Sequence, residues 1–221
     1  MEIIVWSDYA CPFCYIAEGR INNILKDLNA EDKVHFDRHA FQLYPDAAND
    51  VTETTLERFA KKYGLTEKEA AQRIEQISQM GRGEGLEFNY ASTLNTNTMD
   101  AHRLTQWVKD NYDQEVLDKL SDLLFKAYFG DNKKLADHNV LLEAAKEAGV
   151  NVADAKKLLD SDDYRDKVIA DEAFIQQNGV HAVPFFVIDG KGYMGAQPRE
   201  VFEKAIKEGL AKEENEGSKE E

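Results

Sequence analysis

The chain has 221 residues, of which 43% are hydrophobic, and this is enough for one large domain or for one domain with a large insertion. Its net charge of −15 argues against nucleic acid and anionic membranes as partners, because both bind basic surfaces. No apolar stretch approaches the ~18 residues that a membrane span requires. We therefore expect a globular protein with no nucleic-acid and no membrane partner.

The first predicted elements surround the only two cysteines of the chain. An apolar run predicts a buried strand at residues 2–6, and helical periodicity follows over residues 14–28. The sequence Cys11-Pro12-Phe13-Cys14 lies where this strand gives way to the helix. Unpaired backbone N–H groups at a helix N-terminus carry partial positive charge, which favours an anion such as a thiolate.

This position predicts a redox-active dithiol. Cys11 lies nearer to the helix end and to solvent, so we expect it to be the attacking thiolate, whereas Cys14 would resolve the mixed disulfide. Pro12 suits the first helical turn, where its missing N–H would have had no partner. Phe13 offers Cys11 neither charge nor a hydrogen bond, so we expect the activation of Cys11 to be moderate.

A metal site is the main alternative for these cysteines, because His35 and His39 follow them in a finger-like pattern. However, residues 33–41 alternate as a strand does, and two side chains four positions apart on a strand lie roughly 13 Å from each other. Such residues cannot share one ion. We expect no metal and no bound cofactor; two inert structural cysteines are the remaining alternative.

The middle of the chain, from about residue 46 to residue 178, has helical periodicity in every patterned segment. Thr98 is a plausible N-cap of one of these helices. The glycine-rich segment 81–85 predicts a mobile loop in which Arg82 and Glu84 are exposed. The apolar faces of these helices could form an apolar centre of their own.

Strands return near the end of the chain. The apolar run 184–188 predicts a central strand, a turn at 189–192 makes it a hairpin, and a helix that opens near residue 198 closes the fold. Residues 212–221 contain no apolar side chain, which predicts an acidic, flexible tail.

The outer order β-α-β … β-β-α, interrupted by helices, predicts an α/β fold. We expect residues 1–45 and 179–211 to form one discontinuous domain and residues 46–178 to form a helical insertion.

With this order, the chain resembles the thioredoxin-fold oxidoreductases of the DsbA-like family, and in particular its FrnE-type branch. The resemblance covers almost the whole chain and depends on four segments, SDYACPFCY at 7–15, AFQLYP at 40–45, NTMDAHRL at 97–104 and GVHAVPFFV at 179–187. It implies a thioredoxin fold and a cis peptide bond between Val183 and Pro184, beside the dithiol. The exposed backbone of Val183 would then pair with an extended substrate. From the residues alone, Pro184 could merely begin a strand.

The resemblance further implies a protein dithiol–disulfide oxidoreductase, similar to disulfide isomerases, with no bound cofactor. Its partners would be cysteine-containing proteins or peptides and possibly glutathione. Relatives that are strong periplasmic oxidants carry His where Phe13 stands, so we expect a weaker oxidant here. A second cysteine pair reported for some FrnE-type proteins is absent, so no internal relay is expected.

Further candidate site residues come from the same segments. Pro12, Phe13, His102 and His181 are candidates for substrate contact. His102 and Arg103 would line the cleft between the helical insertion and the thioredoxin core, and Asp8 and Tyr9, which precede the dithiol, would shape the rim of the site. The alternatives are a histidine satisfied by its helix neighbours, a surface arginine and a loop histidine.

Two other functions share the same sequence features. Kappa-type glutathione transferases and hydroxychromene-carboxylate isomerases are similar overall but use a serine at the position of Cys11. A polypeptide-binding module with incidental thiols is the non-enzymatic alternative. We expect a cytoplasmic location, because the first strand begins at once and leaves no room for a signal peptide. In such a reducing compartment, a paired dithiol is more often catalytic than structural.

Overall fold

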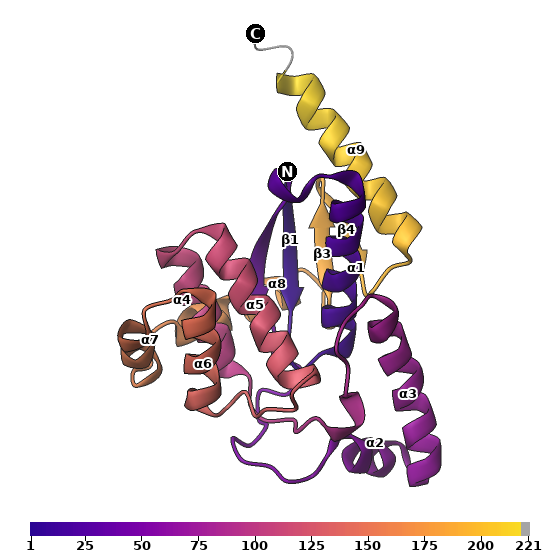
Figure 1. The fold of residues 1–221 in the computed structure, drawn as a ribbon, viewed down its shortest axis with the longest axis vertical. Helices are drawn as coiled ribbons and strands as arrows, with labels where there is room; N and C mark the ends of the chain where they lie inside the picture. The colour runs from indigo at the N-terminus through magenta and orange to yellow at the C-terminus, as the bar shows by residue number, and fades with distance from the viewer. Residues whose placement is uncertain (218–221) are drawn as a thin grey trace.

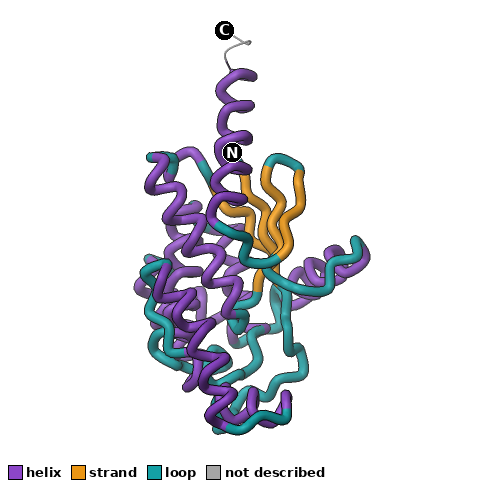
Figure 2. The backbone as a smooth tube through the Cα atoms, turned by 90° about the vertical axis from the view of Figure 1, so that its right-hand side faces the viewer, coloured by secondary structure: helices purple, strands orange, loops and turns teal. Residues whose placement is uncertain are grey.

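Four strands form one mixed sheet in the structure, a computed structural model that describes residues 1–217. They are β1 (Glu2–Ser7), β2 (His35–Ala40), β3 (Phe185–Ile188) and β4 (Lys191–Met194), in the order β2-β1-β3-β4. β1 is parallel to β2 and antiparallel to β3, and β3 is antiparallel to β4. Figure 2 shows the strands side by side. Because β1 and β2 come from the first 40 residues and β3 and β4 from residues 185–194, distant parts of the chain build the sheet together. The predicted α/β fold with a helical insertion is confirmed.

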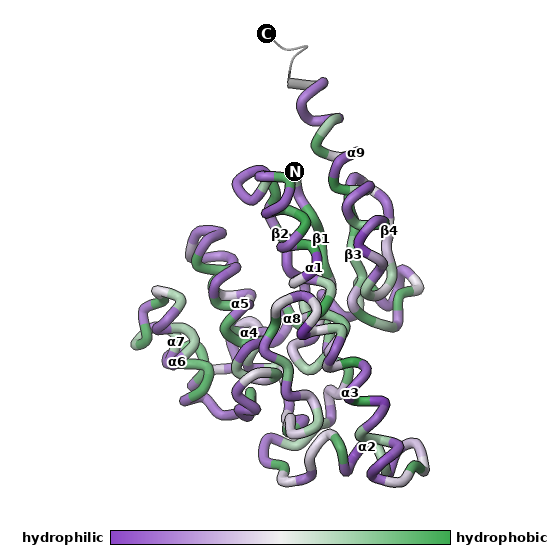
Figure 3. The backbone as a smooth tube through the Cα atoms, turned by 45° about the vertical axis from the view of Figure 1, so that its right-hand side comes forward, coloured by the Kyte–Doolittle hydropathy of each residue, from purple (hydrophilic) through white to green (hydrophobic). Residues whose placement is uncertain are grey.

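Two helices, α1 (Pro12–Leu28) and α9 (Arg199–Gly217), pack together on one face of this sheet. They bury alternate side chains of β1 and β3, because successive strand residues point to opposite faces. The apolar stretch of β1 contrasts with the mixed surface of α9, whose far end extends beyond the body of the molecule (Figures 1 and 3).

Seven helices lie between β2 and β3 in the sequence, and in Figure 1 they surround one side and the lower end of the sheet, with α3 in contact with α1. α4 and α8 contact β2 directly. The helices are α2 (Thr55–Tyr63), α3 (Glu67–Gly83), α4 (Met99–Asn111), α5 (Gln114–Phe129), α6 (His138–Ala148), α7 (Val152–Leu159) and α8 (Arg165–Gln177); two short 3-10 helices cover Glu31–Lys33 and Tyr90–Ser92.

The core of these helices is not separate from the sheet. One cluster of buried residues runs from Trp6 and Ile16, around the sheet and α1, to Leu104 and Phe125 in α4 and α5. The helical segment therefore shares its apolar centre with the strands. The division of the chain into two domains stays a prediction.

Two segments predicted to be flexible, the glycine-rich loop and the first part of the C-terminal tail, are helical instead. α3 continues through the glycine-rich segment to Gly83, and Glu84 pairs with Arg20 of α1 at 2.7 Å rather than being solvated. Gly81 is buried against Phe88, so it makes room for a close contact instead of a flexible loop.

At the other end, α9 extends to Gly217, so residues 212–217 continue a helix where a flexible tail is predicted. The rest of that predicted tail lies outside the described residues. No helix within residues 1–217 has the length and apolar character that crossing a membrane would require.

Candidate functional site

The two cysteines lie at the N-terminus of α1, as predicted. β1 ends at Ser7, and a turn closed by a hydrogen bond from the Cys11 N–H to the Asp8 carbonyl (2.9 Å) leads into the helix. Cys11 is the N-cap residue, Pro12 occupies the first turn, and Cys14 lies one turn further along. Both cysteines are free thiols.

The expected exposure of Cys11 is wrong. Its side chain is 2% exposed and that of Cys14 is 0% exposed. The sequence places Cys11 at a helix end, but the segment that leads into β3 returns from far along the chain and covers this end. A substrate sulfur can therefore reach Cys11 only if that segment makes room.

The covering contact comes from Val183. The Cys11 thiol donates a hydrogen bond to the Val183 carbonyl oxygen, with an Sγ–O distance of 3.6 Å. The peptide bond between Val183 and Pro184 is cis, which confirms the expectation from the family resemblance. The dithiol and this backbone, 172 residues apart in sequence, thus form one site.

The two thiols have different surroundings. Burial raises the pKa of the Cys14 thiol well above its ordinary value, and the hydrogen bond with Cys11 and the charge of Cys11 raise it further. Cys14 is thus disfavoured as a thiolate at neutral pH, which suits a thiol that acts second rather than first.

The other candidate contact residues lie at different depths. Phe13 projects beside Cys11 and is 38% exposed, and His181 is exposed in the segment just before Val183. Pro12 is buried. Phe13 and His181 are therefore placed where a bound polypeptide could touch them, whereas Pro12 is not.

His102 and Arg103 do not line an open cleft. His102 is buried in α4, with its Nε2 atom 3.3 Å from Asp8 Oδ1. The Arg103 guanidinium is also buried and donates to main-chain oxygens of Leu158, Ser161 and Asp163, at and beyond the end of α7. The predicted placement of Arg103 in a cleft between the helical insertion and the core is therefore wrong, and so is the alternative of a surface arginine.

Asp8 and Tyr9, predicted at the rim, are buried beneath it. The Tyr9 hydroxyl lies 2.7 Å from the Thr105 hydroxyl of α4, and the Tyr9 ring packs against His102 with ring centroids 5.1 Å apart. The turn between β1 and the dithiol is therefore anchored to α4 through two consecutive side chains.

His39, one of the two histidines of the metal alternative, has other partners. His39 contacts Asp37 of its own strand and Asp171 of α8, at 3.0 and 2.7 Å. Among the residues described, no cluster of three or more potential ligands converges as a metal site would require.

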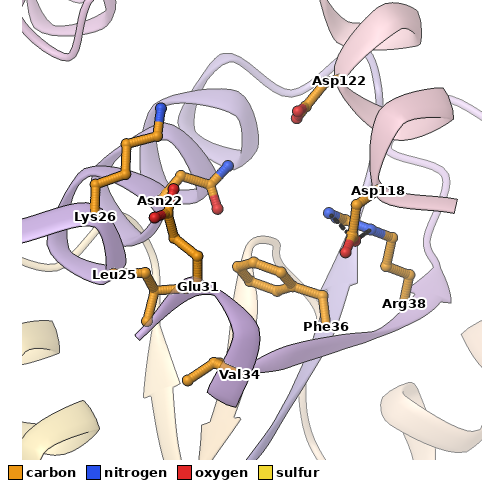
Figure 4. Close-up of a pocket in the computed structure, with 9 residues that line it drawn as sticks. All are labelled: Asn22, Leu25, Lys26, Glu31, Val34, Phe36, Arg38, Asp118 and Asp122. Atoms are coloured by element: carbon orange, nitrogen blue, oxygen red, sulfur yellow. Dashed lines mark hydrogen bonds and ion pairs between the residues drawn. The ribbon is translucent and has the colours of Figure 1, made fainter. Parts of the chain in front are cut away.

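A surface pocket of about 240 Å³ lies between α1, β2 and α5, and it contains neither cysteine (Figure 4). At one side of it, Arg38 pairs with Asp118 at 3.1 Å. Arg38 also pairs with the buried Glu18 of α1. This pocket contains none of the predicted site residues. We interpret it as part of the charged boundary between the sheet and the helical segment.

Two neighbours of the site were missed from the sequence. Tyr90 is buried, and this burial raises the pKa of its hydroxyl well above its ordinary value; the charge of nearby Cys11 raises it further. The Glu172 carboxylate of α8 accepts a hydrogen bond from the Gln42 N–H at 2.8 Å. Neither residue belongs to a recognisable motif, so only the tertiary fold could place them.

Comparison with known proteins gives one family. Residues 2–207 match the model of the DSBA-like thioredoxin domain. A crystal structure of a probable DsbA oxidoreductase from Streptomyces coelicolor is similar, with 31% identity and a TM-score of 0.85. It covers 96% of this chain, which in turn covers 90% of that one.

More distant structures share the fold. A 2-hydroxychromene-2-carboxylate isomerase is 13% identical, with a TM-score of 0.72 over 98% of both chains. The cytosolic disulfide reductase DsbM from Pseudomonas aeruginosa is 14% identical, with a TM-score of 0.61 over 96% of this chain and 99% of that one. A structure of DsbM with GSH is similar to the same degree.

Proposed function

This chain belongs to the DSBA-like thioredoxin family, and we propose that it is a thiol–disulfide oxidoreductase that uses Cys11 as nucleophile and Cys14 as resolving thiol. The observation that carries the proposal is the contact between the Cys11 thiol and the Val183 carbonyl, which joins the dithiol to the cis-proline segment. The raised pKa of the Cys14 thiol, caused mainly by burial, supports its role as the thiol that acts second.

The reaction proceeds in two exchanges. The Cys11 thiolate attacks one sulfur of a substrate disulfide, forms a mixed disulfide and releases the other substrate sulfur as a thiolate. Cys14 then loses its proton to water, attacks Cys11 Sγ, and releases the remaining substrate sulfur. The substrate disulfide is reduced by two electrons, and the Cys11–Cys14 pair is oxidised to a disulfide.

The substrates we propose are cysteine-containing proteins or peptides. An extended segment would replace the Cys11 contact at Val183, beside Pro184, and pair with this main chain while the exposed Phe13 and His181 contact its side chains. A small thiol such as glutathione would return the dithiol to its reduced form, and the DsbM structure with GSH supports that class of reductant.

We also propose a reducing compartment, the cytoplasm. Both cysteines of the chain lie in the dithiol, so none is left to form a structural disulfide of the kind common in secreted proteins. The likeness to a cytosolic reductase is consistent with this location. Isomerase activity and membership of the FrnE-type branch remain part of the same proposal.

The direct test is insulin reduction with glutathione as reductant. We expect activity in the natural protein and none above background for Cys11→Ser. Cys14→Ser should accumulate a mixed disulfide with the substrate, detected as added mass that a reductant removes, because no thiol remains to displace the substrate. Full activity of Cys11→Ser would refute the proposal.

The kappa-type glutathione transferase or isomerase is a second candidate, because the hydroxychromene-carboxylate isomerase has the same fold. That chemistry needs one activated group at position 11 and no resolving thiol. If glutathione conjugation or isomerisation survives in Cys14→Ser while the natural protein fails to reduce insulin, this second function is correct.

A further inference from the structure

Two basic side chains on one face of α2 have no acidic partner. Arg58 and Lys62 lie four positions apart, so they are neighbours on the surface of the helix. Neither pairs with a carboxylate within residues 1–217, whereas Lys61, next to Lys62 in sequence, pairs with Glu53 at 3.8 Å. Carboxylates are plentiful in a chain with a net charge of −15, so this local excess of positive charge is a candidate site for an anion.

Aromatic rings hold both cations in place. The Arg58 guanidinium carbon lies 4.9 Å from the centroid of the Tyr44 ring. The Lys62 ammonium lies 5.6 Å from the same centroid, 5.5 Å from that of Tyr63, and 3.5 Å from the Tyr44 hydroxyl. An aromatic face attracts a cation without neutralising its charge. We call Tyr44, Arg58, Lys62 and Tyr63 the α2 patch.

The α2 patch has hydrogen-bonding capacity that the described residues do not use. Tyr63 is 52% exposed, and the Lys62 side chain is also exposed. The Arg58 side chain is half-buried, and its Nε atom has no hydrogen-bond partner among the described residues. A buried donor without a partner costs free energy, which an acceptor from a ligand would recover. The planar guanidinium matches the geometry of a carboxylate.

Tyr44 reports the positive potential at this site. Burial raises the pKa of the Tyr44 hydroxyl, but Arg58 and Lys62 outweigh burial and lower the pKa overall. Nearby positive charges favour the anionic form of a group in this way. A carboxylate beside the Tyr44 hydroxyl would be stabilised by the same two cations.

The α2 patch lies at the same end of the molecule as the dithiol. The Cys11 N–H donates to the Asp8 main-chain oxygen, and Asp8 Oδ2 accepts from the Leu43 N–H at 2.8 Å. Tyr44 therefore directly follows a residue that is hydrogen-bonded to the dithiol turn. α2 itself lies beyond the end of the sheet toward which β1 points (Figure 1).

One buried residue responds to both sites. Burial raises the pKa of Tyr90 most, while Arg58 lowers it and Cys11 raises it. α2 also contacts the short 3-10 helix that begins with Tyr90. An extended polypeptide advances about 3.3 Å per residue, so a segment of a few residues can contact the dithiol and the α2 patch together.

We propose that the α2 patch binds an acidic side chain of the polypeptide substrate, a few residues from the substrate cysteine in sequence. This specificity rests on the proposed function. The net negative charge of the chain repels acidic polypeptides, so the attraction is confined to the patch. The patch thereby selects acidic segments and also orients them along the site.

The test measures a single exchange, in the full chain carrying Cys14→Ser. Each probe is a peptide with one cysteine, activated as a mixed disulfide with 2-thiopyridine. The Cys11 thiolate attacks the peptide sulfur, forms a protein–peptide disulfide and releases pyridine-2-thiolate, which stopped-flow absorbance detects. One glutamate lies about two to six residues from the cysteine, on either side, to cover the range of an extended segment. Each peptide has a glutamine counterpart.

For at least one placement, we expect the glutamate peptide to react about fivefold faster than its glutamine counterpart at low ionic strength. Adding Arg58→Gln or Lys62→Gln should move this ratio of rates toward one, because each removes one of the two cations. Adding Lys62→Glu should reverse the preference, so that a lysine peptide reacts faster than the glutamate peptide.

Lys61→Gln is the matched control. It removes one positive charge from the same helix but none from the α2 patch, so it should leave the ratio of rates unchanged. A substitution that merely loosens the fold would alter the rates of both peptides together and would also leave their ratio unchanged. Circular dichroism shows whether each variant is folded.

Three results would overturn the inference. Equal rates for every glutamate and glutamine pair, or a ratio that the Arg58 and Lys62 substitutions do not alter, would refute it and leave the proposed function intact. If these substitutions slowed only the mixed disulfide of glutathione with 2-thiopyridine, the bound carboxylate would be that of glutathione and not of a polypeptide. Failure to react with any probe would refute the proposed function, and the inference with it.

Discussion

At the scale of single residues, the side chain between Cys11 and Cys14 is the simplest one to change in order to alter how oxidising the dithiol is. Phe13 is half-exposed beside Cys11 and brings no charge to it. A histidine there would add a partial positive charge that stabilises the Cys11 thiolate, and hence the reduced form of the couple. We therefore predict that Phe13→His makes the dithiol more oxidising.

Equilibration with mixtures of reduced and oxidised glutathione measures this change. The reduced fraction of Phe13→His at a fixed mixture should exceed that of the natural protein, by about tenfold in the equilibrium constant for each unit by which the histidine lowers the pKa of the Cys11 thiol. Phe13→Leu is the control, because it changes the shape without adding a charge. A lower reduced fraction in Phe13→His would contradict the prediction.

The identity and spacing of the reactive residues could be read from the sequence, because C-x-x-C at a strand-to-helix junction is a local pattern. The burial of Cys11 could not, since the Val183 carbonyl that covers it comes from 172 residues away. The same limit applies to His102, whose motif is recognisable but whose partner, Asp8, is 94 residues distant.

At the scale of elements, α3 shows why a glycine-rich segment can be helical where its sequence predicts a loop. Three glycines within five residues favour a loop on conformational grounds. Here Gly81 instead allows α3 to approach the ring of Phe88, which is 2% exposed and stacks on Phe129 with ring centroids 4.7 Å apart. Tertiary packing, which local propensity does not describe, therefore determines the helical conformation of this segment.

This packing predicts opposite effects for two neighbouring substitutions. A Cβ at position 81 would lie 2.7 Å from Phe88 Cε2, and the stacked ring cannot move away. Overpacking costs about 1–3 kcal/mol, more than the gain in helix propensity of up to about 1 kcal/mol. We therefore expect Gly81→Ala to lower the free energy of unfolding by about 1–2 kcal/mol.

Gly83→Ala is the matched control, because nothing lies within 4 Å of a Cβ at that position. It should be neutral or slightly stabilising. Urea unfolding followed by circular dichroism measures both variants. Equal stability of the two would show that the Phe88 contact does not limit the size of residue 81.

At the scale of the whole molecule, the helical segment is attached to the sheet by charges as well as by the shared core. His39 of β2 lies between Asp37 and Asp171 of α8, and its ring stacks on Trp6 of β1 with centroids 4.8 Å apart. Lys109 of α4 also pairs with Asp37. The alternation of residues 33–41 predicted a strand here, but the partners of His39 lie on helices that only the fold brings near.

These contacts predict how stability depends on pH. Burial alone would lower the pKa of His39, but the hydrogen bonds with Asp171 and Asp37 raise it from 6.5 to about 9. Native His39 therefore holds its proton at pH values where the unfolded chain has lost it. Its contribution to stability is complete below about pH 6.5 and is lost as the pH rises through about 9.

We accordingly expect the free energy of unfolding to fall between pH 6.5 and 9, by an amount on the order of 1–2 kcal/mol after allowing for partial exposure of the ring. His39→Gln cannot take up this proton, so the decrease should be smaller in that variant by the same amount. Urea titrations at half-unit pH steps compare the two proteins, and their difference isolates His39 from the other groups that titrate there. A difference that stays constant over this range would mean that His39 has the same pKa in the folded and the unfolded protein, so that its contacts with Asp37 and Asp171 do not hold a proton on the ring.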